Sequence, residues 1–185
     1  MHLEKFLGWL VFLALPGPLA AGSPGGLSSQ TFDRILEFTR PGPCPVVAET
    51  AVWVDGARQR PVPLKLYYPA GGEQRLPVIV YSHGLGGSRE GCAYLGRFWA
   101  SHGFLSVHPQ HHGSDGQVWR GKIRPRAAIK ASFDDPQNLV DRAADLRFVL
   151  DSLESHAARQ TPLGRRIDTS RIGRASCRER VSECV

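Results

Sequence analysis

The segment from Pro77 to Arg89 constrains the fold of this chain most strongly. Its apolar residues predict a buried strand that runs directly into the turn Ser82-His83-Gly84-Leu85-Gly86. Small residues in such a turn leave backbone N–H groups free to stabilise an oxygen that gains negative charge, an effect of roughly 2.7–4 kcal/mol per donor in acyl transfer. The alternative is a parallel sheet whose strands end in Gly-rich loops that carry no chemistry. Both interpretations place the segment in an α/β sheet.

The residues after the turn continue the alternation of helix and strand. We expect a helix over Gly91–His102, a short strand over Phe104–Val107 and then the loop Gln110-His111-His112-Gly113-Ser114-Asp115. Together with the turn, this pattern resembles the α/β-hydrolases, and within them the dienelactone hydrolases and bacterial relatives of platelet-activating factor acetylhydrolase. The loop resembles the family's Asp-His-x-Gly-Ser-Asp sequence, with Gln110 where the family has aspartate. The resemblance extends from Val46 to about Gly173 and implies the N-terminal half of an α/β-hydrolase fold, a mostly parallel sheet with flanking helices.

The resemblance also implies which parts of an active site this chain carries. In the family, a serine nucleophile lies in a Gly-x-Ser-x-Gly elbow, and the acid and the histidine follow later in the sequence. No such pentapeptide occurs here, and Ser176 lacks flanking glycines at the required offsets. By resemblance, the backbone N–H of Leu85 is one oxyanion donor, and the nucleophile, the acid and the base are absent from this chain. We expect His83 to shape the turn rather than to act as a base.

The last residues differ in character from the domain before them. The segment Ile167–Gly173 resembles the strand that leads into the elbow, but Arg174-Ala175-Ser176-Cys177-Arg178-Glu179-Arg180-Val181 is charged where a buried strand should be apolar. The codons ATC GGA AGA GCG TCG TGT AGG GAA AGA GTG would encode residues 172–181 and resemble a widely used sequencing adapter. We therefore expect residues 172–185 to be an artefactual tail on an N-terminal fragment. The alternative is a genuine basic, disordered C-terminus.

The N-terminus has the pattern of a secretory signal. Glu4 and Lys5 precede an apolar run, Phe6–Leu15, and Leu19-Ala20-Ala21 follows it. This pattern predicts a signal peptide over residues 1–21 and a periplasmic or secreted protein. The run is shorter than the roughly 20 apolar residues that span a bilayer, so we expect no stable membrane insertion after signal removal. An uncleaved signal anchor is the alternative.

Between the two ends we expect one partial domain over residues 46–171, preceded by a Pro- and Gly-rich segment over residues 22–45. Residues 46–54 and 62–69 alternate apolar with polar positions. This alternation predicts a half-buried antiparallel hairpin, with a turn at Asp55-Gly56.

The weak pattern between Gln117 and Asp134 indicates an excursion beside the active-site mouth. The clearest helix follows, with Asp135-Pro136 as its N-cap and first residue. Apolar residues at helical spacing predict one buried stripe on it: Leu139, Val140, Ala143, Leu146, Val149, Leu150 and Leu153. We expect Asp141, Asp145 and Asp151 to mark its solvated face, which would make the helix scaffold.

The histidines and the charge argue against other kinds of site. His108, His111 and His112 cluster with Asp115 and could bind zinc, but the adjacent His111 and His112 would point apart. We therefore expect no metal and no cofactor. The formal charge of +6 comes from scattered arginines without a basic helix or an aromatic-interleaved patch, so we expect no nucleic-acid partner.

These features predict a secreted serine-type carboxylic ester hydrolase that, in its full-length form, acts on a small-molecule ester. The fragment itself is expected to be inactive. Two alternatives stay open: a non-catalytic binding protein with the α/β-hydrolase fold, and a genuine short structural or interaction module. An elbow directly after Ile172-Gly173 in an intact gene favours the enzyme, a replaced elbow serine favours the binding protein, and a genomically encoded Arg-rich end favours the module.

Overall fold

The computed structural model describes residues 39–159 and 161–176. The chain divides into two units, residues 1–40 and residues 41–185, and all elements described below lie in the second unit. The expected signal peptide over residues 1–21 and the tail from Cys177 onward lie outside the described residues. Among the helices that are described, none is both long and apolar enough to span a bilayer.

A β-hairpin opens the fold. Strands β1 (Val46–Asp55) and β2 (Arg60–Pro69) pair antiparallel along their whole length. Asp55 closes the turn between them, because its carboxylate accepts the backbone N–H groups of Ala57 and Arg58 at 3.1 and 3.2 Å. The predicted hairpin and its turn are confirmed.

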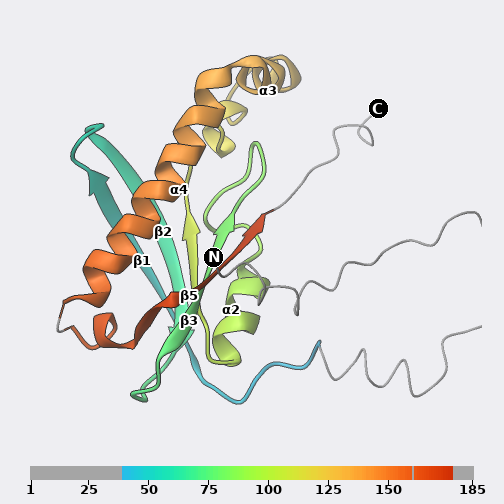
Figure 1. Cartoon of the computed structure of the whole chain (residues 1–185). Coiled ribbons are helices and arrows are strands. Elements are labelled where there is room, and N and C mark those ends of the chain that lie inside the picture. Colours follow the sequence, from blue (N-terminus) through green and yellow to red (C-terminus); the bar gives the residue numbers. More distant parts are fainter. Residues whose placement is uncertain (1–38, 160, 177–185) are drawn as a thin grey trace, which may run out of the picture. The chain divides into compact units, whose positions relative to one another are not determined.

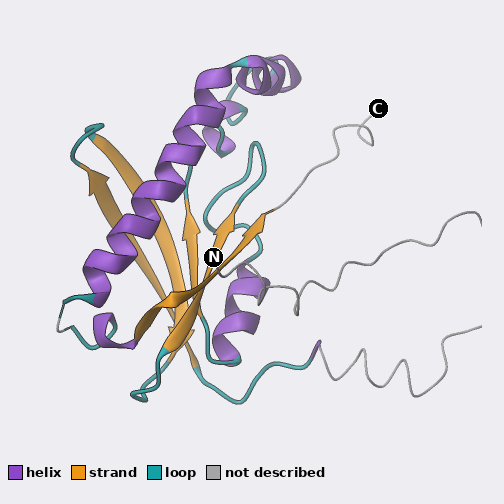
Figure 2. Cartoon of the chain, viewed as in Figure 1, coloured by secondary structure: helices purple, strands orange, loops and turns teal. Residues whose placement is uncertain are grey.

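The strands form one mixed sheet in the order β1-β2-β4-β3-β5 (Figure 2). Strands β3 (Leu76–Ser82), β4 (Leu105–Pro109) and β5 (Ile167–Ser176) run parallel, and β2 joins them by pairing antiparallel with β4. The C-terminal ends of parallel strands lie at the same edge of a sheet, where α/β proteins bind their ligands. The turn after β3, the loop after β4 and the end of β5 at Ser176 therefore lie at this edge.

Helices cover both faces of this sheet. Helix α4 (Pro136–Ala157) crosses one face (Figure 1), where two of its residues join the hydrophobic core. That core consists of Val62, Leu64, Leu66, Leu76, Val78, Val80, Leu105, Val107, Val149, Leu153 and Ile167. Successive side chains of a strand point to opposite faces, so Tyr67 and His108 point away from this core. They pack against helix α2 (Ala93–Ser101), which confirms the predicted α/β architecture with flanking helices.

Helix α2 approaches its face of the sheet closely at Gly96. A Cβ atom at this position would lie 2.4 Å from the ring of Tyr67 and 2.9 Å from Nε2 of His108. Glycine therefore allows the helix backbone to pack against the rings of Tyr67 on β2 and His108 on β4. The helix begins after Cys92, whose Sγ accepts the hydroxyl of Tyr81 at 3.0 Å.

The region expected to be an irregular excursion contains a helix. Helix α3 (Pro125–Asp134) follows a short 3₁₀ turn, η1 (Gly116–Val118). None of the residues of α3 is buried. One sequence signal for this helix was present, because Pro125 is its first residue, a position that proline favours.

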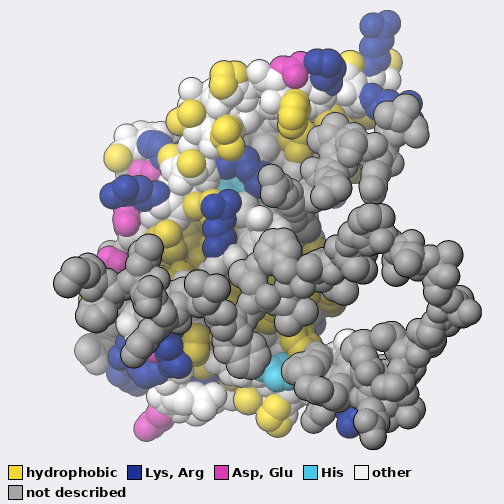
Figure 3. Space-filling model, turned by 45° about the vertical axis from the view of Figure 1, so that its right-hand side comes forward, with side chains coloured by type: hydrophobic (Ala, Val, Ile, Leu, Met, Phe, Trp, Pro, Cys, Tyr) yellow, Lys and Arg dark blue, Asp and Glu magenta, His cyan; other side chains and the backbone are white. Residues whose placement is uncertain are grey.

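Helix α4 begins as predicted, but its apolar stripe is only partly buried. Asp135 caps the helix by accepting the N–H of Gln137 at 2.9 Å. Val149 and Leu153 are buried, whereas Leu139 and Val140 are 71% and 58% exposed. Figure 1 shows the first turns of α4 beyond the strand ends, and Figure 3 shows hydrophobic side chains on the surface at that level. The expectation of one buried stripe was wrong because this part of the helix has no strand to cover.

Strand β5 continues past the residue at which we expected the domain to end. A short 3₁₀ turn, η2 (Gly164–Arg166), leads into it, and it pairs with β3 as far as Ser176, which lies opposite Ser82. Among the described strands β5 is an edge, and Arg171 and Arg174 on it are exposed. Charged residues fit an open edge, although they do not fit a buried strand. The boundary between domain and tail at residues 171 and 172 stays a prediction.

The close contact at Gly96 makes the Gly96→Ala variant a test of the packing of α2. Its free energy of unfolding should fall by about 1–2 kcal/mol, because the added methyl group meets the Tyr67 ring and outweighs the gain in helix propensity. Urea denaturation measures the change. Gly56→Ala is the matched control, since nothing lies within 4 Å of a Cβ at Gly56. Equal stabilities of the two variants would contradict the packing.

Candidate functional site

The turn after β3 has a fixed backbone conformation. The N–H of Gly86 donates to the carbonyl of Ser114 at 2.9 Å, and the carbonyl of Gly86 accepts the indole N–H of Trp119 at 2.9 Å. Gly86 has a φ of 75°, which glycine adopts without strain. Both polar backbone groups of this residue are therefore used to hold the turn.

Leu85, the predicted oxyanion donor, lies in this turn. Within the part of the chain that the structure describes, no group accepts its backbone N–H, and the residue is half-buried. An oxyanion hole requires a donor that is held in place but left free for the substrate oxygen. The geometry suits the predicted role of Leu85, and the role itself stays a prediction.

His83 joins the turn to the loop after β4. Its Nε2 accepts the backbone N–H of His111 at 3.1 Å, so the proton lies on Nδ1, which donates to the carbonyl of Gly84 at 2.7 Å. Burial lowers the pKa of His83 to about 4, which keeps the ring neutral. His83 thus shapes the turn, as predicted, and both of its ring nitrogens are occupied.

Gln110 occupies the position where the resemblance led us to expect aspartate. Its side-chain carbonyl accepts the N–H of Arg89 at 2.8 Å, and its amide donates to the carboxylate of Asp115 at 2.7 Å. An aspartate here would face Asp115 with a like charge, whereas the glutamine amide donates to it. Gln110 therefore stabilises the loop.

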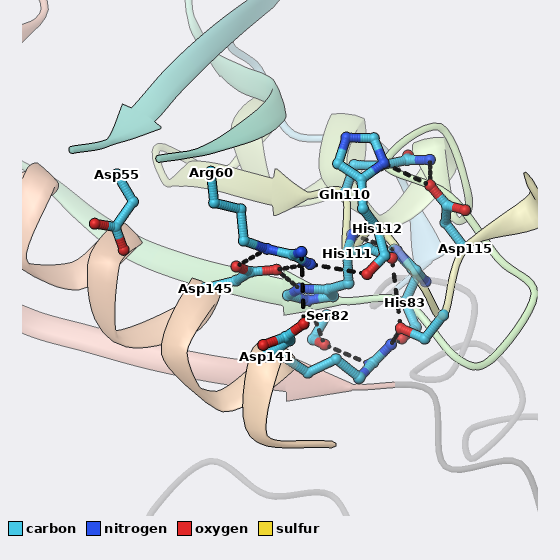
Figure 4. A network of polar contacts seen from close by, with 12 residues as sticks. Asp55, Arg60, Ser82, His83, Gln110, His111, His112, Asp115, Asp141 and Asp145 are labelled. Carbon is cyan, nitrogen blue, oxygen red and sulfur yellow. Dashed lines mark hydrogen bonds and ion pairs between the residues drawn. The ribbon is translucent and has the colours of Figure 1, made fainter. Parts of the chain in front are cut away.

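A buried chain of polar side chains lies beneath the turn (Figure 4). The hydroxyl of Ser82 lies 3.1 Å from Nε2 of His111, and Nδ1 of His111 lies 3.1 Å from the carboxylate of Asp145. The carboxylate fixes the imidazole proton on Nδ1, so Nε2 accepts the O–H of Ser82. Ser82, His111 and Asp145 are 1%, 0% and 0% exposed.

The position of Asp145 contradicts the expectation that it marks a solvated face. Its carboxylate accepts one hydrogen bond at 2.9 Å from each of Arg58 and Arg60. Burial alone would raise its pKa, but hydrogen bonds from His111, Arg60 and Arg58 outweigh burial and lower the pKa to about 2. The prediction failed because the partners that allow this charge to be buried are distant in sequence. Asp151, with a side chain 67% exposed, does lie on the solvated face.

Ser82, His111 and Asp145 are connected in the order of a catalytic triad. The Ser82 hydroxyl is nevertheless closed to a substrate, because it is 1% exposed and also accepts Nη2 of Arg142 at 2.9 Å. A nucleophile needs room for a carbonyl carbon to approach its oxygen. These three side chains therefore support the neighbouring turn and supply no nucleophile.

The histidines of the loop do not converge on a common point. His108 packs against the Tyr67 ring with ring centroids 5.1 Å apart, His111 is buried in the polar chain, and the side chain of His112 is 45% exposed. The adjacent pair points apart, as predicted. Across residues 39–159 and 161–176, no group of three or more His, Cys, Asp or Glu side chains is arranged to hold a metal ion.

Comparison with known sequences identifies a similar family. Residues 58–118 match the family model of platelet-activating factor acetylhydrolase, isoform II. This segment contains the turn with Leu85 and the loop with His111. A search of curated proteins found no significant match.

Two solved structures are similar to the chain. A ferulic acid esterase from Streptomyces cinnamoneus is 25% identical with a TM-score of 0.57, over 74% of this chain and 53% of the esterase. A candidate dienelactone hydrolase from Klebsiella pneumoniae subsp. pneumoniae is 17% identical with a TM-score of 0.51, over 71% of this chain and 50% of that protein. The second likeness concerns the fold alone. The chain thus spans about half the length of both proteins.

The buried histidines predict that stability falls in mild acid. Burial lowers the pKa of His83 and His108 to about 4 and also lowers the pKa of His111. In the unfolded chain the pKa of a histidine is about 6.5. Below that pH the unfolded state therefore binds protons that the folded state does not. The free energy of unfolding should therefore fall between about pH 6.5 and pH 4, by at most about 3 kcal/mol for each of His83 and His108.

Urea denaturation at several pH values measures this loss. His83→Gln should reduce the slope between those pH limits, whereas His102→Gln, at an exposed histidine, should leave it unchanged. A free energy of unfolding that stays constant over this range would contradict the burial of neutral histidines.

Proposed function

We propose that this chain, which has the fold of the α/β-hydrolases and is similar to platelet-activating factor acetylhydrolases and dienelactone hydrolases, carries the first half of a serine-type carboxylic ester hydrolase. The main support is the half-buried N–H of Leu85, which is held without an acceptor among the described residues at the C-terminal end of β3. Donors fixed in this way stabilise the oxyanion of acyl transfer.

The position of β5 supports a nucleophile close to this donor. Ser176, the last described residue of the strand, pairs with Ser82, which directly precedes the turn with Leu85. In the full-length form, a Gly-x-Ser-x-Gly elbow a few residues beyond Gly173 would place its serine at this edge of the sheet.

The charge of Arg174 supports the proposal that residues 172–185 are foreign to the domain. Desolvation and, after it, the charge of Arg174 lower the pKa of the half-buried Arg142. A second cation near a partly desolvated one is unfavourable, and an apolar residue at position 174 would avoid it. Such a pair is expected where a strand has not evolved together with the helix that packs near it.

The proposed mechanism follows from these positions. The elbow serine attacks the ester carbonyl carbon while a downstream histidine, oriented by a downstream acid, accepts the serine proton. The N–H of Leu85 and the N–H after the serine bind the oxyanion. The intermediate expels the alcohol, which takes the proton from the histidine, and water then hydrolyses the acyl-enzyme. We further propose that the signal peptide over residues 1–21 directs this enzyme to the periplasm or out of the cell.

Ester hydrolysis by two forms of the protein tests the proposal. The 185-residue chain should not hydrolyse p-nitrophenyl acetate above the buffer rate, because it lacks the elbow. The full-length form from an intact gene copy should hydrolyse it and react with a fluorophosphonate at the elbow serine. Replacement of that serine by alanine should abolish labelling and lower kcat by a factor of about 10⁶.

Two other results would overturn the proposal. Equal hydrolysis by the 185-residue chain would place the nucleophile within it. A folded full-length form that has no elbow serine and hydrolyses no ester would instead be a binding protein with the same fold.

A further inference from the structure

We propose that the buried side chains of Asp145 and His111 and the half-buried side chain of Arg142 are positioning residues for the turn that carries the Leu85 N–H. Asp145 and Arg142 on helix α4, together with His111 in the loop after β4, fix the direction of this donor without touching the substrate. The expected effect on kcat rests on the ester hydrolysis proposed above. The expected effect on the position of the Leu85 N–H rests on the contacts alone.

The turn takes its position from the loop after β4. Three hydrogen bonds join them: Gly86 N–H to the Ser114 carbonyl at 2.9 Å, Gly116 N–H to the Gly87 carbonyl at 2.7 Å, and His111 N–H to Nε2 of His83 at 3.1 Å. These bonds lie on both sides of Leu85 in the sequence. A displacement of the loop would therefore turn the Leu85 N–H away from the substrate oxygen.

Helix α4 fixes two of the loop residues that make these bonds. Asp145 accepts Nδ1–H of His111 at 3.1 Å, and Nη1 of Arg142 donates to the hydroxyl of Ser114 at 2.9 Å. Asp145, His111 and Ser114 are all buried. Each of these contacts between the helix and the loop is thus made by a loop residue that also bonds to the turn.

Arg142 also reaches the turn directly. Its Nη2 donates to the hydroxyl of Ser82 at 2.9 Å and to the carbonyl of His83. The planar guanidinium therefore bridges the end of β3, the turn and the loop with donors in fixed directions. A lysine would keep the charge but could not bind all three acceptors with this geometry.

The negative charge of Asp145 selects one hydrogen-bonding arrangement of Asp145, His111 and Ser82. As an acceptor only, it keeps the proton of His111 on Nδ1, which leaves Nε2 to accept the O–H of Ser82 and leaves the Ser82 lone pairs for Arg142. An asparagine at position 145 can donate as well as accept, so both histidine tautomers become possible. It also leaves Arg58 and Arg60 without their carboxylate.

Kinetics of full-length variants separate positioning from a purely structural role. Asp145→Asn should lower kcat for p-nitrophenyl acetate about 10²-fold and leave KM within about twofold, because a donor misplaced by about 1 Å loses that much in the transition state. Arg142→Lys should lower kcat about tenfold in the same way. Asp151→Asn, on the exposed face of the same helix, is the matched control and should keep kcat within about twofold.

A spectroscopic measurement decides the geometric part even if the enzyme is inactive. In folded variants, the amide resonance of Leu85 should shift and its hydrogen exchange should accelerate in Asp145→Asn and not in Asp151→Asn. A folded Asp145→Asn variant with unchanged kcat and an unchanged Leu85 resonance would overturn the positioning role. If the wild-type full-length form hydrolyses no ester, the proposed function fails, and the Leu85 resonance alone decides the positioning role.

Discussion

A carboxylate buried beneath helix α4 determines how the functional edge of this sheet is built. Charge is costly to bury unless donors surround it, so Asp145 requires the hydrogen bonds that it accepts. Its donors come from separate elements: Arg58 from the hairpin turn, Arg60 from β2 and His111 from the loop after β4. One charge thus holds the hairpin, the loop and the helix together at the end of the sheet where the Leu85 turn lies.

The lateral edge of the described sheet is open at β5. Strand β5 has a neighbour on one side among the described strands, and exposed strand edges tend to pair with other chains. The solved structures of similar fold are about twice as long as the matched part. In the proposed full-length form, the continuation after β5 would cover this edge and bring the nucleophile beside the turn.

Local patterns in the sequence were sufficient for elements whose cause is local. The hairpin of β1 and β2, the turn at Asp55 and the cap at Asp135 follow from alternation and from side chains that bond within a few residues. The burial of Asp145 could not be predicted from local patterns, since its hydrogen-bond partner His111 lies 34 residues away in the sequence. One signal was present: Asp145 precedes the buried Val149 and Leu153 at four-residue spacing, which places it on the face that covers the sheet.

The genomic sequence across the codons for Arg171 to Val185 tests the central claim most directly. If the chain is the first half of a serine ester hydrolase, the reading frame in the source DNA continues beyond Gly173 through a Gly-x-Ser-x-Gly elbow to a later acid and histidine. If the genome instead encodes the Arg-rich end and stops after Val185, the protein has no Gly-x-Ser-x-Gly elbow to place a serine beside the Leu85 turn. That result would contradict the proposed enzyme.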